Sequence, residues 1–131
     1  MTSHLIIGNG AAGTTAAEQI RKHDPDAVIT LITQEALPLY SRIRIPEFLS
    51  GKISESALIM KDLPWHAQRG INLVTETKVS QVDYQNKTAI TADGRDFSYD
   101  TLLLATGSNS FVPPVKGSDK KGVFTLRTVA D

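Results

Sequence analysis

The sequence contains no cysteine among its 131 residues. This absence excludes a disulfide framework, a thiolate metal site and a redox-active cysteine pair within the chain. The three histidines, His4, His23 and His66, are scattered, and no two of them stand at metal-ligand spacing. We therefore expect neither a metal site nor thiol chemistry from these residues.

Excess charge and long apolar runs are also absent. Lys plus Arg and Asp plus Glu number 14 each, so the formal net charge is zero, and nothing favours nucleic acid or an anionic membrane as a partner. No apolar run approaches the roughly 20 residues of a membrane span. The N-terminus lacks the basic start and apolar core of a signal peptide. The composition, with 40% hydrophobic residues, predicts one globular, cytoplasmic domain.

The first part of the chain alternates strand and helix signals. Residues 5–7, Leu-Ile-Ile, are apolar on both faces and predict a buried parallel strand. A glycine loop follows, and residues 11–22 predict a helix whose alanines face the sheet while Arg21 faces water. Residues 28–32 predict a second strand, so the three elements form a right-handed βαβ unit.

The rest of the chain predicts short helices and then an antiparallel region. Helical turns are expected at 47–49 and 54–60, and a helix follows with Asp62 as its cap, Trp65 packed inward and His66 on the surface. From Ile71 the hydrophobic period is two. The expected strands are 71–74, 78–83, 88–91, 96–99 and 101–105, the last returning to the parallel sheet. The pattern predicts an α/β fold with a parallel sheet, crossover helices and a β-meander.

Residues 8–13, Gly-Asn-Gly-Ala-Ala-Gly, match the dinucleotide-binding pattern GxGxxG between a strand and a helix. Gly8 permits the tight turn, Gly10 lets a pyrophosphate approach the backbone, and Gly13 lets the helix pack on the strand. The free amide groups and the helix dipole meet the phosphate charge. This context favours a nucleotide site over a glycine turn that only packs.

An acidic residue should follow the second strand and hold the ribose hydroxyls. Glu35 stands there, about 20 residues past the loop. Thr33 and Gln34 intervene between the strand and this acid, so Gln34 is the alternative ribose ligand. Since NAD and FAD sites share such a loop, these residues alone leave the choice between the two dinucleotides open.

Four segments, in order, resemble the FAD domain of the pyridine-nucleotide-dependent flavoprotein oxidoreductases, the pyridine nucleotide-disulfide oxidoreductase family. They are the glycine loop with its helix, the meander from Val79 to Tyr99, Leu-Leu-Leu-Ala-Thr-Gly-Ser at 102–108, and the segment 111–127. In that family the Ala-Thr-Gly turn passes by the flavin, and the last segment runs toward the NAD domain. The resemblance implies a Rossmann-like FAD-binding domain with FAD as its cofactor.

Within the family, Pro-Leu-Tyr-Ser-Arg at 38–42 resembles the class of the nitrite reductase large subunits and rubredoxin reductases. There this segment brings a cation to the flavin, which implies that Arg42 lies near the flavin or its phosphates, with Arg44 as the competitor. The match also gives the backbone of Val79 a contact with adenine. The cofactor-binding residues expected are Gly8, Gly10, Ala11, Ala12, Gly13, Glu35, Arg42, Val79, Ala105, Thr106 and Gly107.

The resemblance implies hydride transfer from NAD(P)H to the flavin and electron transfer to an acceptor, without a redox disulfide because no thiol is present. No residue of the chain is expected to be catalytic. A complete family member has a second GxGxxG loop, a segment that completes the FAD domain and an interface domain. Residues 1–131 contain none of these. We therefore expect a partial FAD/NAD(P)-binding domain that is inactive alone.

The expected partners follow from the same resemblance. They are an NAD-binding domain or chain, an electron acceptor that is a protein or a small molecule, and a further copy of the chain, because apolar surface left uncovered favours self-association. Rubredoxin, ferredoxin, nitrite through a partner subunit, and quinone are all open as acceptors. The alternative function is a non-catalytic nucleotide-binding or structural module that needs a partner chain.

Overall fold

The computed structural model describes residues 1–131, and the chain divides into two compact units. Unit 1 comprises Met1–Tyr40 and Ile59–Gly107, and unit 2 comprises Ser41–Leu58 and Ser108–Asp131. Every strand of the molecule lies in unit 1. No helix of the structure is both long and apolar enough to cross a membrane.

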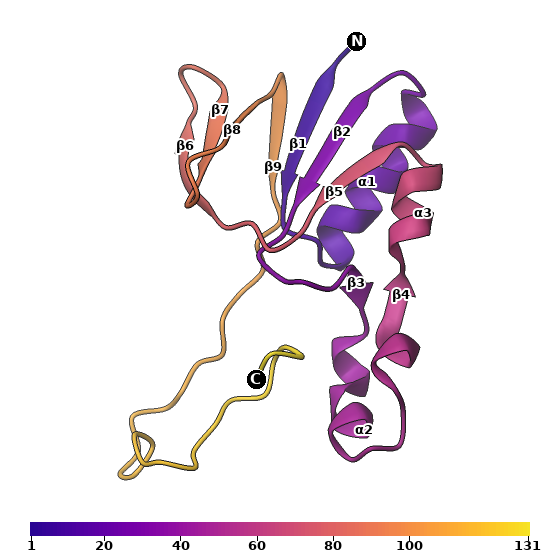
Figure 1. Cartoon of the computed structure of the whole chain (residues 1–131). Helices are drawn as coiled ribbons and strands as arrows, with labels where there is room; N and C mark the ends of the chain where they lie inside the picture. Colours follow the sequence, from indigo (N-terminus) through magenta and orange to yellow (C-terminus); the bar gives the residue numbers. More distant parts are fainter. The chain divides into compact units, whose positions relative to one another are not determined.

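A four-stranded parallel sheet forms the centre of unit 1, in the order β5-β2-β1-β9 (Figure 1). Its strands are β1 (Ser3–Ile7), β2 (Val28–Ile32), β5 (Ile71–Val74) and β9 (Thr101–Leu104). In the register of β1, Ile6 lies opposite Leu31 of β2 and Leu103 of β9. The predicted βαβ unit and the return of the last strand to the parallel sheet are both confirmed.

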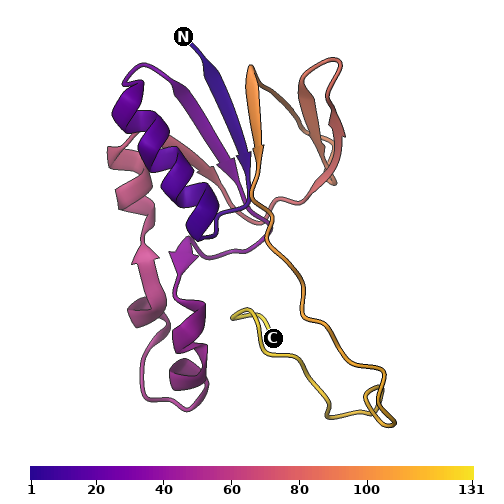
Figure 2. The same cartoon turned by 180° about the vertical axis from the view of Figure 1, so that it is seen from behind.

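Both faces of this sheet are covered, because the side chains of β1 alternate between two apolar clusters. Ile6 packs on the face that carries the helices α1 (Ala11–His23) and α3 (Leu63–Gln68). Leu5 and Ile7 pack on the other face, against an antiparallel meander (Figures 1 and 2). The strands of the meander are β6 (Val79–Asp83), β7 (Thr88–Thr91) and β8 (Asp96–Ser98). The result is a three-layer Rossmann-like unit.

The remaining elements are short. In unit 1, β3 (Leu39–Tyr40) pairs antiparallel with β4 (Ile59–Lys61). Unit 2 contains the 3-10 turns η1 (Arg42–Arg44) and η2 (Glu55–Leu58) and the helix α2 (Ile45–Leu49). The helical turn predicted for 54–60 is therefore correct only in its first part, since the chain leaves it to form β4. Residues 105–131 contain no helix or strand.

Helix α3 begins as predicted, with the Asp62 carboxylate accepting a hydrogen bond from the Trp65 amide at 2.8 Å. The Trp65 ring packs against the helix-side cluster of the sheet. The surface position predicted for His66 is wrong, because this side chain is only 1% exposed and its Nδ1 lies 2.7 Å from the Asp62 carbonyl oxygen. A helix of six residues is too short for its periodicity to show which neighbour points inward.

The solvent-facing position predicted for Arg21 is also wrong. Its guanidinium donates to carbonyl oxygens in two turns, the one after α1 and the one between α3 and β5. The acceptors are the carbonyl oxygens of Asp24, Pro25, Ala27, Arg69 and Gly70. Carbonyls at helix ends lack intrahelical partners, and a guanidinium has five donors in a fixed fork. Arg21 therefore fastens the end of α1 to the start of β5.

Replacing Arg21 with Met should keep the aliphatic stem but leave these carbonyl oxygens without their charged donor. We expect the free energy of unfolding, measured by urea denaturation, to fall by about 2 kcal/mol. The control is Lys22→Met, which removes the same charge from the next, exposed position of α1 and should change stability by no more than about 0.5 kcal/mol. An equal decrease in the free energy of unfolding in the two variants would contradict the role of Arg21 as the donor to these carbonyl oxygens.

The tight turn between β7 and β8 depends on Asp93. Its carboxylate accepts hydrogen bonds from Arg95 Nε, at 2.9 Å, and from the Thr91 hydroxyl. Arg95 also donates from Nη2 to Thr77 Oγ1 at 2.8 Å, in the loop after β5. These contacts, with that of Arg95 first, lower the pKa of Asp93 from 3.8 to about 2. The turn is therefore most stable with Asp93 ionised.

Because the pKa of Asp93 is lower in the folded state, its contribution to stability is complete above pH 4 and disappears as the pH falls toward 2. In Asp93→Asn the free energy of unfolding should decline less steeply across this interval than in the wild type. Some decline should remain, since the pKa values of Asp83 and Asp100 are also lowered by hydrogen bonds. Urea denaturation at a series of pH values measures both slopes, and parallel slopes would contradict the prediction.

Candidate dinucleotide-binding site

The glycine loop lies at the carboxyl edge of the parallel sheet, where β1 ends and α1 begins (Figure 1). The Gly8 amide donates to the carbonyl oxygen of Ile32 at 2.8 Å, and the Ala105 amide donates to that of Ile7, also at 2.8 Å. The loop is thereby tied to the ends of β2 and β9. Ligands of parallel α/β sheets bind at this edge.

Two of the loop glycines are required by the packing of the protein itself. A Cβ atom on Gly8 would lie 2.1 Å from the Ala105 carbonyl oxygen, and the φ of Gly8 is +115°. A Cβ atom on Gly13 would lie 1.9 Å from the carbonyl oxygen of Gly8. These contacts hold the strand, the loop and the helix too close together for any side chain at either position.

Gly10 differs from both of these glycines. Its backbone angles, φ −81° and ψ −170°, suit any residue, and a Cβ atom there would have nothing within 4 Å. Neither strain nor packing therefore requires glycine at this position. The open space lies at the N-terminus of the 13-residue helix α1, which has no side-chain cap and no acidic residue in its first turn. Exposed amides at such a terminus suit an anionic group.

Asn9 adds a polar group that sequence reasoning did not single out, because the pattern GxGxxG leaves its position open. Its Oδ1 accepts a hydrogen bond from the Thr14 hydroxyl at 2.9 Å, which links the loop to the first turn of α1. Its Nδ2 is buried and has no hydrogen-bond partner. A buried donor without a partner costs about 1–3 kcal/mol, so the loop favours the arrival of an acceptor.

Glu35 lies on the segment directly after β2 and is half-buried, whereas its alternative Gln34 is exposed. One carboxylate oxygen, Oε2, accepts a hydrogen bond from the hydroxyl of Tyr40. The backbone carbonyl of Glu35 accepts from the Glu76 amide at 3.1 Å. Of the two candidates for a ribose ligand, Glu35 is the one held in place by the protein.

The remaining predicted residues of unit 1 lie around the same edge. Val79 begins β6 three residues after Glu76, whose amide contacts Glu35. The chain turns away after β9 at Ala105–Gly107, and Gly107 has a φ of +70°. Ala105 contacts Gly8 through its backbone. The structure thus brings the glycine loop and the Ala-Thr-Gly turn together and connects Glu35 to the segment that leads into β6.

Arg42 belongs to unit 2, whereas the other predicted residues belong to unit 1. Its Nη1 donates to the carbonyl oxygen of Arg127 at 2.9 Å, and Arg127 in turn donates to the Ser108 hydroxyl at 3.0 Å. Its competitor Arg44 forms an ion pair with Glu47 at 3.2 Å. The role of Arg42 at the cofactor stays a prediction.

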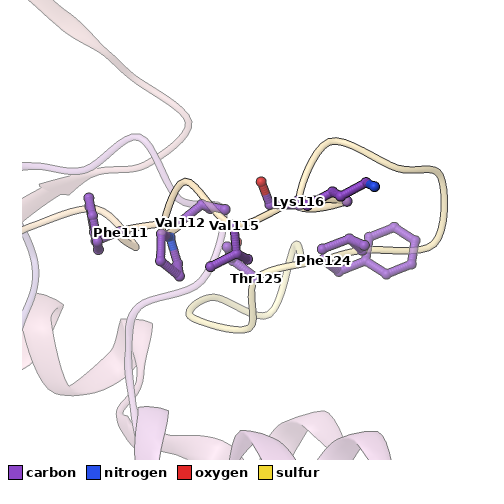
Figure 3. Close-up of a pocket in the computed structure, with 10 residues that line it drawn as sticks. Phe111, Val112, Val115, Lys116, Phe124 and Thr125 are labelled. Atoms are coloured by element: carbon purple, nitrogen blue, oxygen red, sulfur yellow. The ribbon is translucent and has the colours of Figure 1, made fainter.

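Unit 2 also contains a hollow formed by one irregular segment of the chain (Figure 3). Figure 3 shows Phe111 at one end of its lining and Phe124 at the other, with Val115 between them. Both phenylalanines are mostly exposed. None of the residues predicted to bind the cofactor lines this hollow.

A parallel sheet, a glycine turn that opens a helix and an acid after the second strand define a Rossmann-like dinucleotide-binding unit. Comparison with known families is consistent with this class. Residues 2–131 match the family described as pyridine nucleotide-disulphide oxidoreductase. The chain belongs to the pyridine nucleotide-disulphide oxidoreductase family, as the sequence motifs predicted.

Comparison with individual relatives shows what share of their length this chain spans. The chain is 41% identical over 133 residues to an NADH oxidase of Methanocaldococcus jannaschii, covering 97% of this chain and 30% of the relative. It is 39% identical over 128 residues to a nitrite reductase [NAD(P)H] of Bacillus subtilis, and the match covers 97% of this chain and 16% of the relative. The crystal structure of NADH:rubredoxin oxidoreductase from Clostridium acetobutylicum matches with a TM-score of 0.86 and 28% identity. The match covers 98% of this chain and 33% of that protein. The chain thus spans a third or less of each of these proteins.

Gly10→Asp tests whether the open space at the loop serves a ligand. An aspartate at this N-cap position satisfies amides of α1 and complements its dipole, so the unliganded chain should gain about 0.5 kcal/mol of stability. The same carboxylate competes with a phosphate for those amides, so affinity for ADP should fall by at least about tenfold, or 1.4 kcal/mol. Thermal unfolding and calorimetric titration measure the two effects.

The neutral variant Gly10→Asn is the matched control, since it caps the helix without adding a charge. It should weaken ADP binding less than Gly10→Asp does. Wild-type affinity in Gly10→Asp would show that no phosphate binds beside this position.

Proposed function

We propose that the chain is the FAD-binding part of an NAD(P)H-dependent flavoprotein oxidoreductase. The observation that carries this proposal is the contrast within the glycine loop. Packing occupies the space around Gly8 and Gly13, while Gly10 faces open space beside the uncapped end of α1. Such a cradle fits a pyrophosphate. Relatives in the family to which the chain belongs are an NADH oxidase and a nitrite reductase [NAD(P)H], which are both named for a pyridine nucleotide.

Each predicted residue has a role in this proposal. The amides of Ala11, Ala12 and Gly13 would bind the pyrophosphate together with the backbone at Gly10. Glu35 would accept hydrogen bonds from the ribose hydroxyls. For the other residues the resemblance supplies the roles: adenine for the backbone of Val79, the flavin for Ala105, Thr106 and Gly107, and the flavin or its phosphates for Arg42.

FAD bound here would supply the capacity to accept a hydride from NAD(P)H and to pass electrons to an acceptor. The chain has no cysteine, so we propose an electron path without a redox disulfide in these residues. The acceptor is a protein or a small molecule. A relative is named for rubredoxin and another for nitrite, and both remain candidates here.

NAD(P)H needs a second nucleotide site in this proposal. Residues 1–131 contain one GxGxxG loop, and the relatives described above are at least about three times as long. We propose that a further domain or a partner chain binds NAD(P)H and that residues 1–131 alone do not turn over. The competing function, a nucleotide-binding module without catalysis, would bind the same ligands but take no part in electron transfer.

Titration of FAD with the purified chain tests the first part of this proposal. Flavin fluorescence should change on binding. ADP should compete because it shares the pyrophosphate and the ribose with FAD, and FMN should compete poorly because it lacks the AMP half and so has neither the pyrophosphate nor the adenosine ribose. Gly10→Asp should abolish the change. A wild-type chain that binds neither FAD nor ADP would refute the proposed cofactor site.

The complete protein that contains this chain tests the second part. It should be yellow when purified or after reconstitution with FAD, and it should bleach anaerobically when NADH or NADPH is added. A yellow protein that neither coenzyme bleaches would support the non-catalytic module instead.

A further inference from the structure

A tyrosine hydroxyl in unit 1 has its partner in the candidate site. Tyr40 is only 6% exposed, and a buried phenol needs an acceptor for its proton. That acceptor is Oε2 of Glu35, five residues earlier in the chain. The tyrosine itself is fixed by the strand pair in which Tyr40 of β3 lies opposite Ile59 of β4. A rigid donor therefore holds a carboxylate that the proposed function assigns to the ribose.

The backbone of Glu35 is fixed independently of this contact. Its amide donates to the Thr33 hydroxyl at 3.2 Å, and its carbonyl accepts from Glu76 at 3.1 Å. Glu76 adopts a φ of +50°, which is uncommon for a residue other than glycine. The Thr77 amide, next in the chain, donates to the carbonyl oxygen of Thr33 at 2.9 Å. These hydrogen bonds fix the main chain of Glu35. The contact with Tyr40 restricts the torsion angles of its side chain.

The chemistry of the donor matters as much as its position. A phenol donates one hydrogen bond to the carboxylate and brings no charge of its own. An ionised carboxylate has about four lone-pair sites on its two oxygens. The Tyr40 hydroxyl uses one of these sites, on Oε2 of Glu35.

From this arrangement we propose that Tyr40 is a positioning residue for the nucleotide ribose. Its buried hydroxyl orients the Glu35 carboxylate before the dinucleotide arrives, so that less side-chain freedom is lost on binding. This inference rests on the proposed function, since it presupposes that Glu35 meets a ribose. It adds a residue that neither the glycine-loop pattern nor the family resemblance assigned to the site.

The test compares the affinities of the purified chain for ADP and for 2′,3′-dideoxy-ADP, which lacks both ribose hydroxyls. Calorimetric titration of the wild type should show tighter binding of ADP. Tyr40→Phe keeps the ring and removes the hydroxyl, and it should reduce this preference by about fivefold. A purely structural role of the hydroxyl would weaken the binding of both nucleotides equally and leave the preference unchanged.

Two further variants complete the experiment. Glu35→Ala should abolish the preference, and Tyr40→Phe added to Glu35→Ala should change nothing more, because the hydroxyl acts through the carboxylate. Tyr99→Phe removes the hydroxyl of another buried tyrosine of unit 1, within the meander-side cluster, and should leave both affinities as in the wild type.

The outcomes separate this inference from the proposed function. An unchanged preference in Tyr40→Phe, or a further loss when it is added to Glu35→Ala, would overturn the role of Tyr40 while the site itself stands. A wild-type chain that binds neither nucleotide would overturn both.

Discussion

The approach of the glycine loop to the end of β9 is the constraint on which the site depends. A Cβ atom at Gly8 would lie 2.1 Å from the carbonyl oxygen of Ala105, and one at Gly13 would lie 1.9 Å from that of Gly8. Because two glycines leave these spaces empty, β1, α1 and β9 converge at one edge of the sheet. The convergence exposes the first amides of α1 beside Gly10, which is the only loop glycine with open space around it.

The acidic side of the site depends on hydrogen bonds between loops rather than on packing. Bonds to Thr33 and Glu76 hold the backbone of Glu35, and Tyr40 holds its carboxylate. The loop after β5 that includes Glu76 is joined in turn to the β7–β8 turn through Thr77 and Arg95. Three sequence-distant segments thus determine where one carboxylate lies, which gives Glu35 a rigidity that a single loop could not supply.

Local sequence patterns predicted most of the fold. Strand β2 and strand β5 were predicted with their observed bounds, and Asp62 was predicted as the cap of α3. The two misplaced side chains share one cause. Arg21 binds carbonyls of a turn that follows it by almost fifty residues. His66 is buried on α3, a helix that packs against the later strand β5. Neither periodicity nor residue type reports on such long-range contacts.

The sequence by itself determined the class of the protein, because the spacing of the glycines, the position of Glu35 and the Ala-Thr-Gly turn are local and ordered along the chain. The pattern also predicted a separate role for each loop glycine, and only the tertiary structure decided which contacts require glycine at Gly8 and Gly13. Gly8 must be glycine because β9 returns to the sheet and the chain after it fills the space beside Gly8. Gly13 must be glycine because the carbonyl oxygen of Gly8 fills the space beside it. The contact of Tyr40 with Glu35 likewise depends on the folded chain. The hydrogen bond forms only when the fold brings the Tyr40 hydroxyl to the Glu35 carboxylate.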